Sequence, residues 1–150
     1  MTGKTIFVVM NLNSPEGISV NIIEKWFSDL QDEGWSFYYT QSVSEVVYYC
    51  GERGNRTANT AITHQDLFNT MRVFSLKKSG NDVTSYLDGI ERRTMTIDEC
   101  TPSSRDNTLM GGSVTQDYGF TGTIYEIIVY DSALSNPDRQ AVETYHLNKY

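Results

Sequence analysis

The sequence lacks most of the features that mark membrane-spanning or nucleic-acid-binding proteins. Its 150 residues contain only three prolines, and no run of about 18 apolar residues is present that could span a bilayer. Lys and Arg total 12 against 19 Asp and Glu, which gives a net charge of −7. Basic residues do not run longer than pairs such as Arg92-Arg93, so no surface is expected to follow a phosphate backbone. We therefore expect neither a nucleic acid nor a membrane as a partner.

Signals for export are also missing. The N-terminal residues MTGKTIFVVM have no basic start, long apolar stretch or small-residue cleavage site, which predicts a chain made in the cytoplasm without a signal peptide. Only two cysteines are present, Cys50 and Cys100, and neither lies in a C-x-x-C pair. They could pair in an oxidising compartment, but without export two free, partly buried thiols are expected.

Short alternating segments separated by turns make up most of the chain. Asp88-Gly89 is a strong hairpin signal between two of them. Many short strands with a turn every ten or so residues predict an antiparallel sandwich. The predicted strands are Thr5–Leu12, Trp35–Thr40, Val43–Cys50, Met71–Lys78, Val83–Leu87 and Glu91–Ile97.

Three segments have weaker patterns. In Ile18–Leu30 the large apolar residues follow i, i+4, i+8 spacing, which favours a short helix or irregular insert over a strand. Gly51–Asn69 is polar and predicts either a long loop or a pair of weak strands. Asp98–Asp106 is expected to be a loop.

The C-terminal stretch from Gly119 to Tyr150 contains a long strand followed by a helix. Apolar residues occupy both faces of the strand, which predicts that it is central in its sheet. Ser135 with Asp138 approximates a capping box, and Pro137 suits a first helical turn. The expected docking stripe of the helix consists of Leu134, Ala141, Val142 and Tyr145.

These residues also carry a family resemblance. The run F-x-G-x-I-x-E-I-I-V-Y-D-x-A-L-S (Phe120–Ser135), followed by R-Q-x-V-E-x-Y, is similar to the last strand and closing helix of concanavalin A-like jelly rolls, in their laminin-G-like branch of bacterial and phage proteins. VTSYLDGIERR (Val83–Arg93), NTLMGGS (Asn107–Ser113) and TIFVVMNL (Thr5–Leu12) resemble further strands of that family. The resemblance implies an all-β, two-sheet antiparallel jelly-roll sandwich with a short C-terminal helix, formed by residues 1–150 as a single domain.

Two departures from the family have consequences. Tyr145-His146-Leu147 stands where the family has Y-L, so either the last helical turn is rotated or His146 is exposed. The family also has a segment before the strand similar to TIFVVMNL, part of which adds to the sandwich near the terminal strand. Without it, an open sheet edge is expected at Thr5–Leu12 or its neighbour, which favours pairing with another chain.

Catalysis is not expected. Glycoside hydrolases of this fold carry an E-x-D-x-x-E pattern, because two carboxylates must flank one glycosidic bond. That pattern is absent, and Glu126 is a lone acid in its strand. His64 and His146 are far apart in sequence, with no Ser or Cys in a nucleophile elbow. We therefore predict a non-enzymatic protein without a required cofactor.

Sugar and calcium binding remain possible for such a domain. Flat aromatic rings stack on pyranose faces, and the candidates for this role are Trp35, Tyr38, Tyr48 and Tyr118. Packing in the core or between the sheets is the rival interpretation for these rings. The resemblance implies a calcium ion at a rim of the sandwich, for which the candidates are Asp88, Asp106, Asn107 and Asp117. Turn-forming Asp and Asn side chains that bond their own backbone are the rival interpretation.

The resemblance favours a binding or structural module, with a phage virion protein as the main hypothesis, either capsid-decorating or tail-associated. The alternative is a carbohydrate-binding, lectin-like module of a bacterial surface protein. The partners expected are other chains of an oligomer or virion, or a glycan. The virion is the expected location if a phage encodes the chain.

Overall fold

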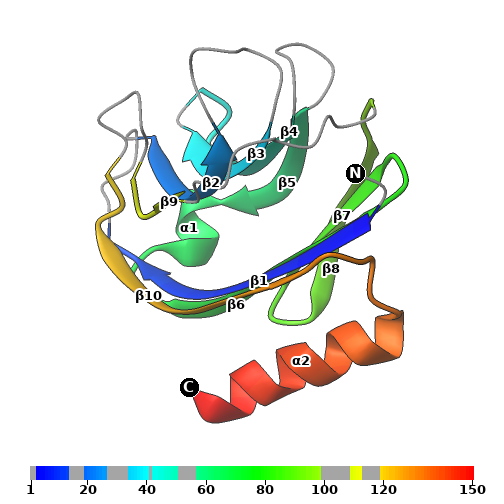
Figure 1. Ribbon diagram of the computed structural model, residues 1–150. Helices are drawn as coiled ribbons and strands as arrows, with labels where there is room; N and C mark the ends of the chain where they lie inside the picture. The colour runs from blue at the N-terminus through cyan, green and yellow to red at the C-terminus, as the bar shows by residue number, and fades with distance from the viewer. Residues whose placement is uncertain are drawn as a thin grey trace.

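The computed structural model describes residues 3–13, 19–26, 34–40, 42–50, 57–98, 109–112 and 119–150. Within these residues two five-stranded antiparallel sheets pack face to face, and a helix lies on the outside of one of them (Figure 1). The predicted two-sheet jelly-roll sandwich with a C-terminal helix is confirmed.

Each sheet mixes strands from distant parts of the sequence. The first sheet has the order β10 (Gly122–Tyr130), β1 (Gly3–Leu12), β6 (Met71–Ser79), β7 (Asp82–Leu87), β8 (Ile90–Thr96). The second has the order β5 (Thr57–Thr63), β4 (Glu45–Cys50), β3 (Gly34–Thr40), β2 (Val20–Trp26), β9 (Leu109–Met110). The two helices are α1 (His64–Leu67) and α2 (Asn136–Lys149). We call the face of each sheet that points away from the other sheet its outer face.

Strand β1 is the strand covered on both sides. It pairs with β10 on one edge and β6 on the other, and nearly all its residues are buried. Ile6 and Val8 belong to the core cluster, whereas Phe7 points outward and contacts His146 of α2. Apolar residues on both faces are typical of such a strand. An edge at Thr5–Leu12 itself is therefore excluded.

The prediction that the terminal strand is central is wrong. Strand β10 pairs with β1 alone among the described strands and forms one edge of the first sheet. Ile124 and Ile127 pack against the core, while Glu126 on the other face meets α2. None of its residues is fully buried, and Tyr125 and Val129 are among its exposed ones, so apolar composition on both faces did not reveal its position in the sheet.

The core is formed where the two sheets meet. Phe37 of β3 stacks on Phe74 of β6, with ring centroids 4.2 Å apart and planes at 28°. Both are fully buried, as are Tyr39 and Tyr48 of the second sheet. Burial of aromatic side chains of this size supplies much of the hydrophobic stabilisation that holds the sheets together.

The short helix or irregular insert expected in Ile18–Leu30 is wrong, because Val20–Trp26 form strand β2. The pairing of β2 with β3 shifts register between Asn21 and Ile23, as at a β-bulge. Consecutive residues Ile22 and Ile23 are consequently both in the core cluster, although neighbours in a regular strand point to opposite faces. The bulge makes the apolar spacing resemble that of a helix.

In the polar Gly51–Asn69 stretch, the described residues 57–69 form strand β5 and the single-turn helix α1. Thr63 caps α1: its hydroxyl accepts from the Asp66 backbone N–H, and the Asp66 carboxylate accepts from the Thr63 N–H. The predicted strands Trp35–Thr40, Val43–Cys50, Met71–Lys78, Val83–Leu87 and Glu91–Ile97 correspond to β3, β4, β6, β7 and β8, with ends shifted by up to two residues.

Helix α2 begins as predicted but docks through different residues. Ser135 is the N-cap, with Pro137 in the first turn. The residues buried against the first sheet are Arg139, Glu143 and His146, whereas Tyr145 is half exposed. The expected apolar stripe is therefore wrong, because the helix is rotated so that polar side chains face the sheet.

Cys50 lies fully buried in β4 and takes part in a disulfide bond. The expectation of a free thiol is wrong for this residue. The sequence contains one other cysteine, Cys100, which lies outside the described residues. None of the described helices is long and apolar enough to cross a membrane.

Candidate functional site

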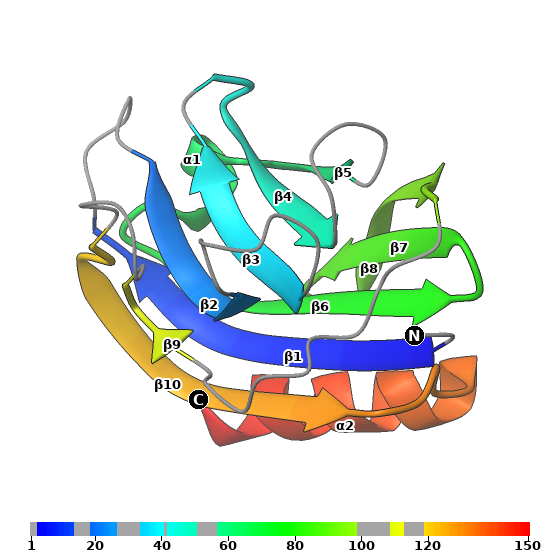
Figure 2. The same ribbon diagram turned by 45° about the horizontal axis from the view of Figure 1, so that its top comes forward.

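The outer face of the second sheet carries a row of polar and aromatic side chains. Directly opposed residues of antiparallel strands share a face, so the register places Asn21, Tyr38, Val47 and Asn59 in one row across β2, β3, β4 and β5. A second row holds Glu24, Ser36 and Tyr49. Neither described helix lies across this face, since α2 lies on the first sheet and α1 follows directly on β5 (Figures 1 and 2).

Three of these side chains form a buried polar cluster. The Asn21 amide Nδ2 donates to Glu24 Oε2, and Ser36 Oγ donates to Asn21 Oδ1 at 3.4 Å. Their exposed fractions are only 3% for Asn21 and 5% for Glu24 and Ser36. Buried polar groups are costly unless they are bonded, and these three side chains bond to one another. A ligand on this face would first meet their half-buried neighbour Tyr38.

Two tyrosines flank this cluster. Tyr38 stands opposite Asn21 and is half-buried, and Tyr49 stands opposite Ser36. An amide, a carboxylate and a hydroxyl beside aromatic rings can hydrogen-bond the hydroxyls of a sugar while a ring packs against its apolar face. We call Asn21, Glu24, Ser36, Tyr38 and Tyr49 the polar face.

The outer face of the first sheet holds a second polar cluster, but α2 fills it. Arg139 donates through Nη1 to both carboxylate oxygens of Glu143, one of them at 2.6 Å, and Ser75 Oγ also donates to Glu143. The Arg139 guanidinium lies 3.6 Å from the ring centroid of Tyr86. Charge, hydrogen bonds and a cation–π contact offset the burial of these ions. The cluster attaches the helix and offers no open ligand position.

Glu126 belongs to this helix contact. Its Oε2 accepts from Lys149 Nζ at 3.1 Å and Tyr150 Oη at 3.5 Å, and lies 3.3 Å from His146 Nε2. The hydrogen bond from Lys149 is the main cause that holds the pKa of Glu126 below its usual value. His146 is fully buried against Phe7, and burial lowers its pKa. His146 is therefore not exposed, and Glu126 has the surroundings of a structural acid.

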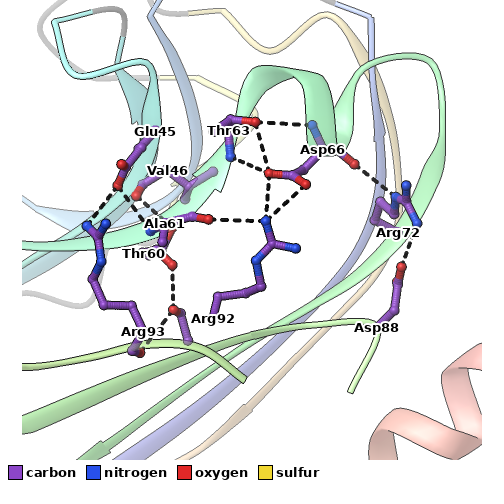
Figure 3. A network of polar contacts seen from close by, with 11 residues as sticks. Glu45, Val46, Thr60, Ala61, Thr63, Asp66, Arg72, Asp88, Arg92 and Arg93 are labelled. Atoms are coloured by element: carbon purple, nitrogen blue, oxygen red, sulfur yellow. Dashed lines mark hydrogen bonds and ion pairs between the residues drawn. The ribbon is translucent and has the colours of Figure 1, made fainter. Parts of the chain in front are cut away.

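A third polar network closes the side of the sandwich where β5 and α1 meet β8 (Figure 3). Arg92 Nη2 donates to both oxygens of Asp66 at 3.1 Å, and Arg93 Nη1 donates to Glu45 at 3.2 Å. Burial raises the pKa of Asp66, but hydrogen bonds from Thr63 and the charge of Arg92 outweigh it, so the pKa is lowered. Each arginine here is paired with an acid, which indicates a structural network between elements far apart in sequence.

The predicted sugar-binding aromatic residues lie in different parts of the structure. Trp35 and Tyr48 lie in the core cluster, where their rings cannot stack on a ligand, so the prediction is wrong for these two. Side chains alternate along β3 and β4, and only Tyr38 of the set reaches the outer face within the described residues. Burial also raises the pKa of Tyr48. Tyr118 lies outside the described residues.

The predicted calcium candidates are not brought together among the described residues. Asp88 accepts from Arg72 Nη1 at 2.7 Å and from the Val73 backbone N–H at 3.0 Å, so both carboxylate oxygens are used within the β7–β8 hairpin region. Asp106, Asn107 and Asp117 lie outside the described residues. No group of three or more potential metal ligands occurs within the described ranges.

Asn21, Glu24 and Ser36 were missed by the sequence reasoning. The period-two alternation that would place Asn21 on a sheet face is broken by the bulge after it, and Ile18–Leu30 was therefore assigned as a helix. The i, i+4, i+8 spacing of the large apolar residues was the signal that favoured a helix or irregular insert there.

The fold is a two-sheet antiparallel β-sandwich, and several solved structures share it. The CBM40 domain of the IT-sialidase of Ruminococcus gnavus, solved with α2,3-sialyllactose, is similar at a TM-score of 0.67 and 19% identity, over 95% of this chain and 83% of that one. A leech intramolecular trans-sialidase matches with a TM-score of 0.68 and 22% identity, over 92% of this chain and 22% of its own.

A third similar structure belongs to botulinum neurotoxin type C, whose cell entry depends on interaction with two ganglioside molecules. It matches with a TM-score of 0.69 and 12% identity, over 96% of this chain and 36% of that chain. No protein-family model and no curated protein matches the sequence. At these identities the similarity establishes the fold. None of these three neighbours is described as a virion protein or as a laminin-G-like domain.

Proposed function

We propose that this protein is a non-catalytic carbohydrate-binding module that holds its glycan on the polar face. Tyr38 carries the proposal, because it is a half-buried aromatic side chain on an outer sheet face that neither described helix covers, and the Asn21–Glu24–Ser36 cluster lies buried beside it. Tyr38, half-buried beside Asn21, supplies a ring for the apolar face of a sugar. This function was the alternative in the sequence-based interpretation, and the fold neighbours favour it over the phage structural hypothesis.

The described residues of the polar face suit the hydroxyl groups of a glycan. They include no Lys or Arg, and Glu24 is an acceptor that would bond sugar hydroxyls and repel a sugar carboxylate. One neighbour was solved with sialyllactose and another depends on gangliosides for cell entry, so sialylated glycans are tested as well, although Glu24 favours a neutral glycan. Lactose and sialyllactose differ only by the acidic sugar, so comparing their affinities shows whether the site binds the neutral part or the sialic acid.

The test is glycan-array screening of the purified chain, followed by calorimetric titration of each hit. We expect Tyr38→Ala to weaken binding about tenfold or more, which corresponds to roughly 1.4 kcal/mol. Tyr38→Phe keeps the ring and should retain most of the affinity. Tyr145→Ala removes a half-exposed tyrosine from α2, on the other side of the sandwich, and is expected to leave binding unchanged.

Circular dichroism and melting of each variant distinguish a lost site from a lost fold. The proposal is overturned if no glycan binds, or if Tyr145→Ala reduces binding as much as Tyr38→Ala does. Release of free sugar from any glycan during the titration would contradict the non-catalytic part of the proposal.

A further inference from the structure

Strand β10 leaves one edge of the first sheet open within the described residues. It pairs with β1 along Gly122–Tyr130, and no backbone hydrogen bond joins its other edge to any described residue. An edge strand presents a row of N–H and C=O groups that another extended chain can pair with. Because these groups are spaced to bond with an extended backbone, the partner that fits such an edge is another β-strand.

The side chains of β10 do little to block such pairing. Glu126 is the only charged residue in the strand, and its carboxylate is held by Lys149 and Tyr150 of α2. Natural edge strands are usually protected by unpaired charges, especially Lys, or by proline, and β10 contains neither residue type. A register shift opposite Val9 and Met10 marks a bulge near Tyr125, which leaves the segment from Glu126 to Tyr130 regular.

The opposite edge of the same sheet differs. Strand β8 has the sequence IERRTMT, and Arg92 and Arg93 form ion pairs with Asp66 and Glu45 across the junction with β5 (Figure 3). Strand β8 thus carries three charged side chains against one in β10, and two of them also tie this edge to the second sheet and α1, so β10 is the less protected of the two edges.

Exposed apolar surface accompanies the β10 edge. Tyr125 and Val129 are 43% and 41% exposed, and the Tyr125 ring lies 5.3 Å from that of Tyr150, also 43% exposed. Met110, 65% exposed, lies on β9, which is on the same side of the sandwich as β10 in both views (Figures 1 and 2). The open backbone edge of a nine-residue strand is thus accompanied by exposed apolar side chains.

We propose that β10 pairs antiparallel with β10 of a second copy of this chain about a two-fold axis. The two first sheets then form one continuous ten-stranded sheet, with an α2 helix from each copy on the same outer face. A second copy fits because it presents the same open edge and the same apolar residues, as an isologous two-fold contact requires. The polar face lies on the other sheet, so the dimer would present two glycan sites.

Sedimentation equilibrium of the wild-type chain over a series of micromolar concentrations tests the proposal. We expect a dimer, and we expect Val129→Lys to weaken its dissociation constant at least about tenfold. Ile90→Lys is the matched control, because Ile90 is an exposed apolar residue at the start of β8 on the opposite edge. It should leave the dissociation constant unchanged.

Amide hydrogen exchange of the wild type gives a second measurement that needs no variant. The outward amides of β10 should become protected as the dimer fraction rises, while those of β8 should not change. If Val129→Lys fails to fold, Tyr125→Lys takes its place in the series. A monomer at every concentration, or a dimer that Ile90→Lys weakens as much as Val129→Lys does, overturns the proposal.

Discussion

The two outer faces of this sandwich both carry buried polar side chains, yet they differ in what lies on them. On the first sheet, α2 brings Arg139 and Glu143 onto Ser75 and Tyr86, and each charge is neutralised within the chain. On the second sheet, Asn21, Glu24 and Ser36 are buried on a face that neither described helix covers. Polar residues on the first face attach a helix, and those on the second lie beside Tyr38, the half-buried side chain proposed to contact a ligand.

The comparison shows that burial of polar groups alone does not identify a functional site. A cluster whose donors and acceptors are matched by another element of the chain is structural, and its removal should cost mainly stability. Removing a cluster on a face without such an element should lower the unfolding free energy less and weaken ligand binding more. The predictions below test this difference in order of decreasing effect on stability.

The largest effect is expected from Glu143→Ala. The change leaves the Arg139 guanidinium buried without its carboxylate, and breaking a buried pair in this way costs about 3–5 kcal/mol of unfolding free energy. Urea unfolding followed by circular dichroism measures it. Gln140→Ala, three residues earlier at an exposed position of α2, is the control and should change stability by less than about 0.5 kcal/mol. A small effect of Glu143→Ala would show that the helix contact is not a structural unit.

A smaller loss is expected from Asn21→Ala on the second sheet. Glu24 and Ser36 each lose one hydrogen-bond partner, which costs about 1–3 kcal/mol. The same unfolding experiment applies, with the exposed Asn148→Ala as the control. A loss as large as that of Glu143→Ala would mean that the polar face is as structural as the helix contact, and would weaken its assignment as a ligand site.

The smallest effect is a dependence on pH that comes from His146. Burial lowers its pKa in the folded chain below the ordinary 6.5, with the Glu126 carboxylate and the Lys149 ammonium acting in opposite directions. The unfolded chain therefore binds the proton more readily, so this contribution to stability is complete above pH 6.5 and is lost as the pH falls towards the folded pKa. Glu126 and Asp66 also have lowered pKa values, but they titrate below this window.

Unfolding free energies measured between about pH 5 and pH 7 check this expectation. Stability should decrease towards the acidic end of this range in the wild type, and His146→Leu should flatten the slope. An unchanged slope in His146→Leu would assign the pH dependence to other groups.

Sequence patterns were sufficient to predict the strands in which polar and apolar residues alternate regularly. The β6, β7 and β8 strands, the hairpin at Asp88-Gly89 and the Ser135 cap all follow from local rules of periodicity and turn chemistry. Such rules act between residues close in sequence, so one chain read alone can reveal them. The sandwich class followed from the number and spacing of these strands together with the family resemblance.

The positions of elements relative to one another depended on tertiary structure. Apolar faces on both sides of β10 indicated a covered strand, but only the pairing placed it at an edge beside β1, more than a hundred residues away in sequence. The bulge at Asn21 turned a strand into an apparent helical pattern, and the rotation of α2 buried Arg139, Glu143 and His146 in place of Val142 and Tyr145.

The sequence by itself determined which of the regular segments are strands and where the last helix begins, because those are local properties. Which faces are covered, and therefore which polar residues are placed to meet a ligand, was decided by contacts between residues far apart in the chain. Helix α2 covers Ser75 and Tyr86 only because the chain returns to the first sheet after β10, about sixty residues later.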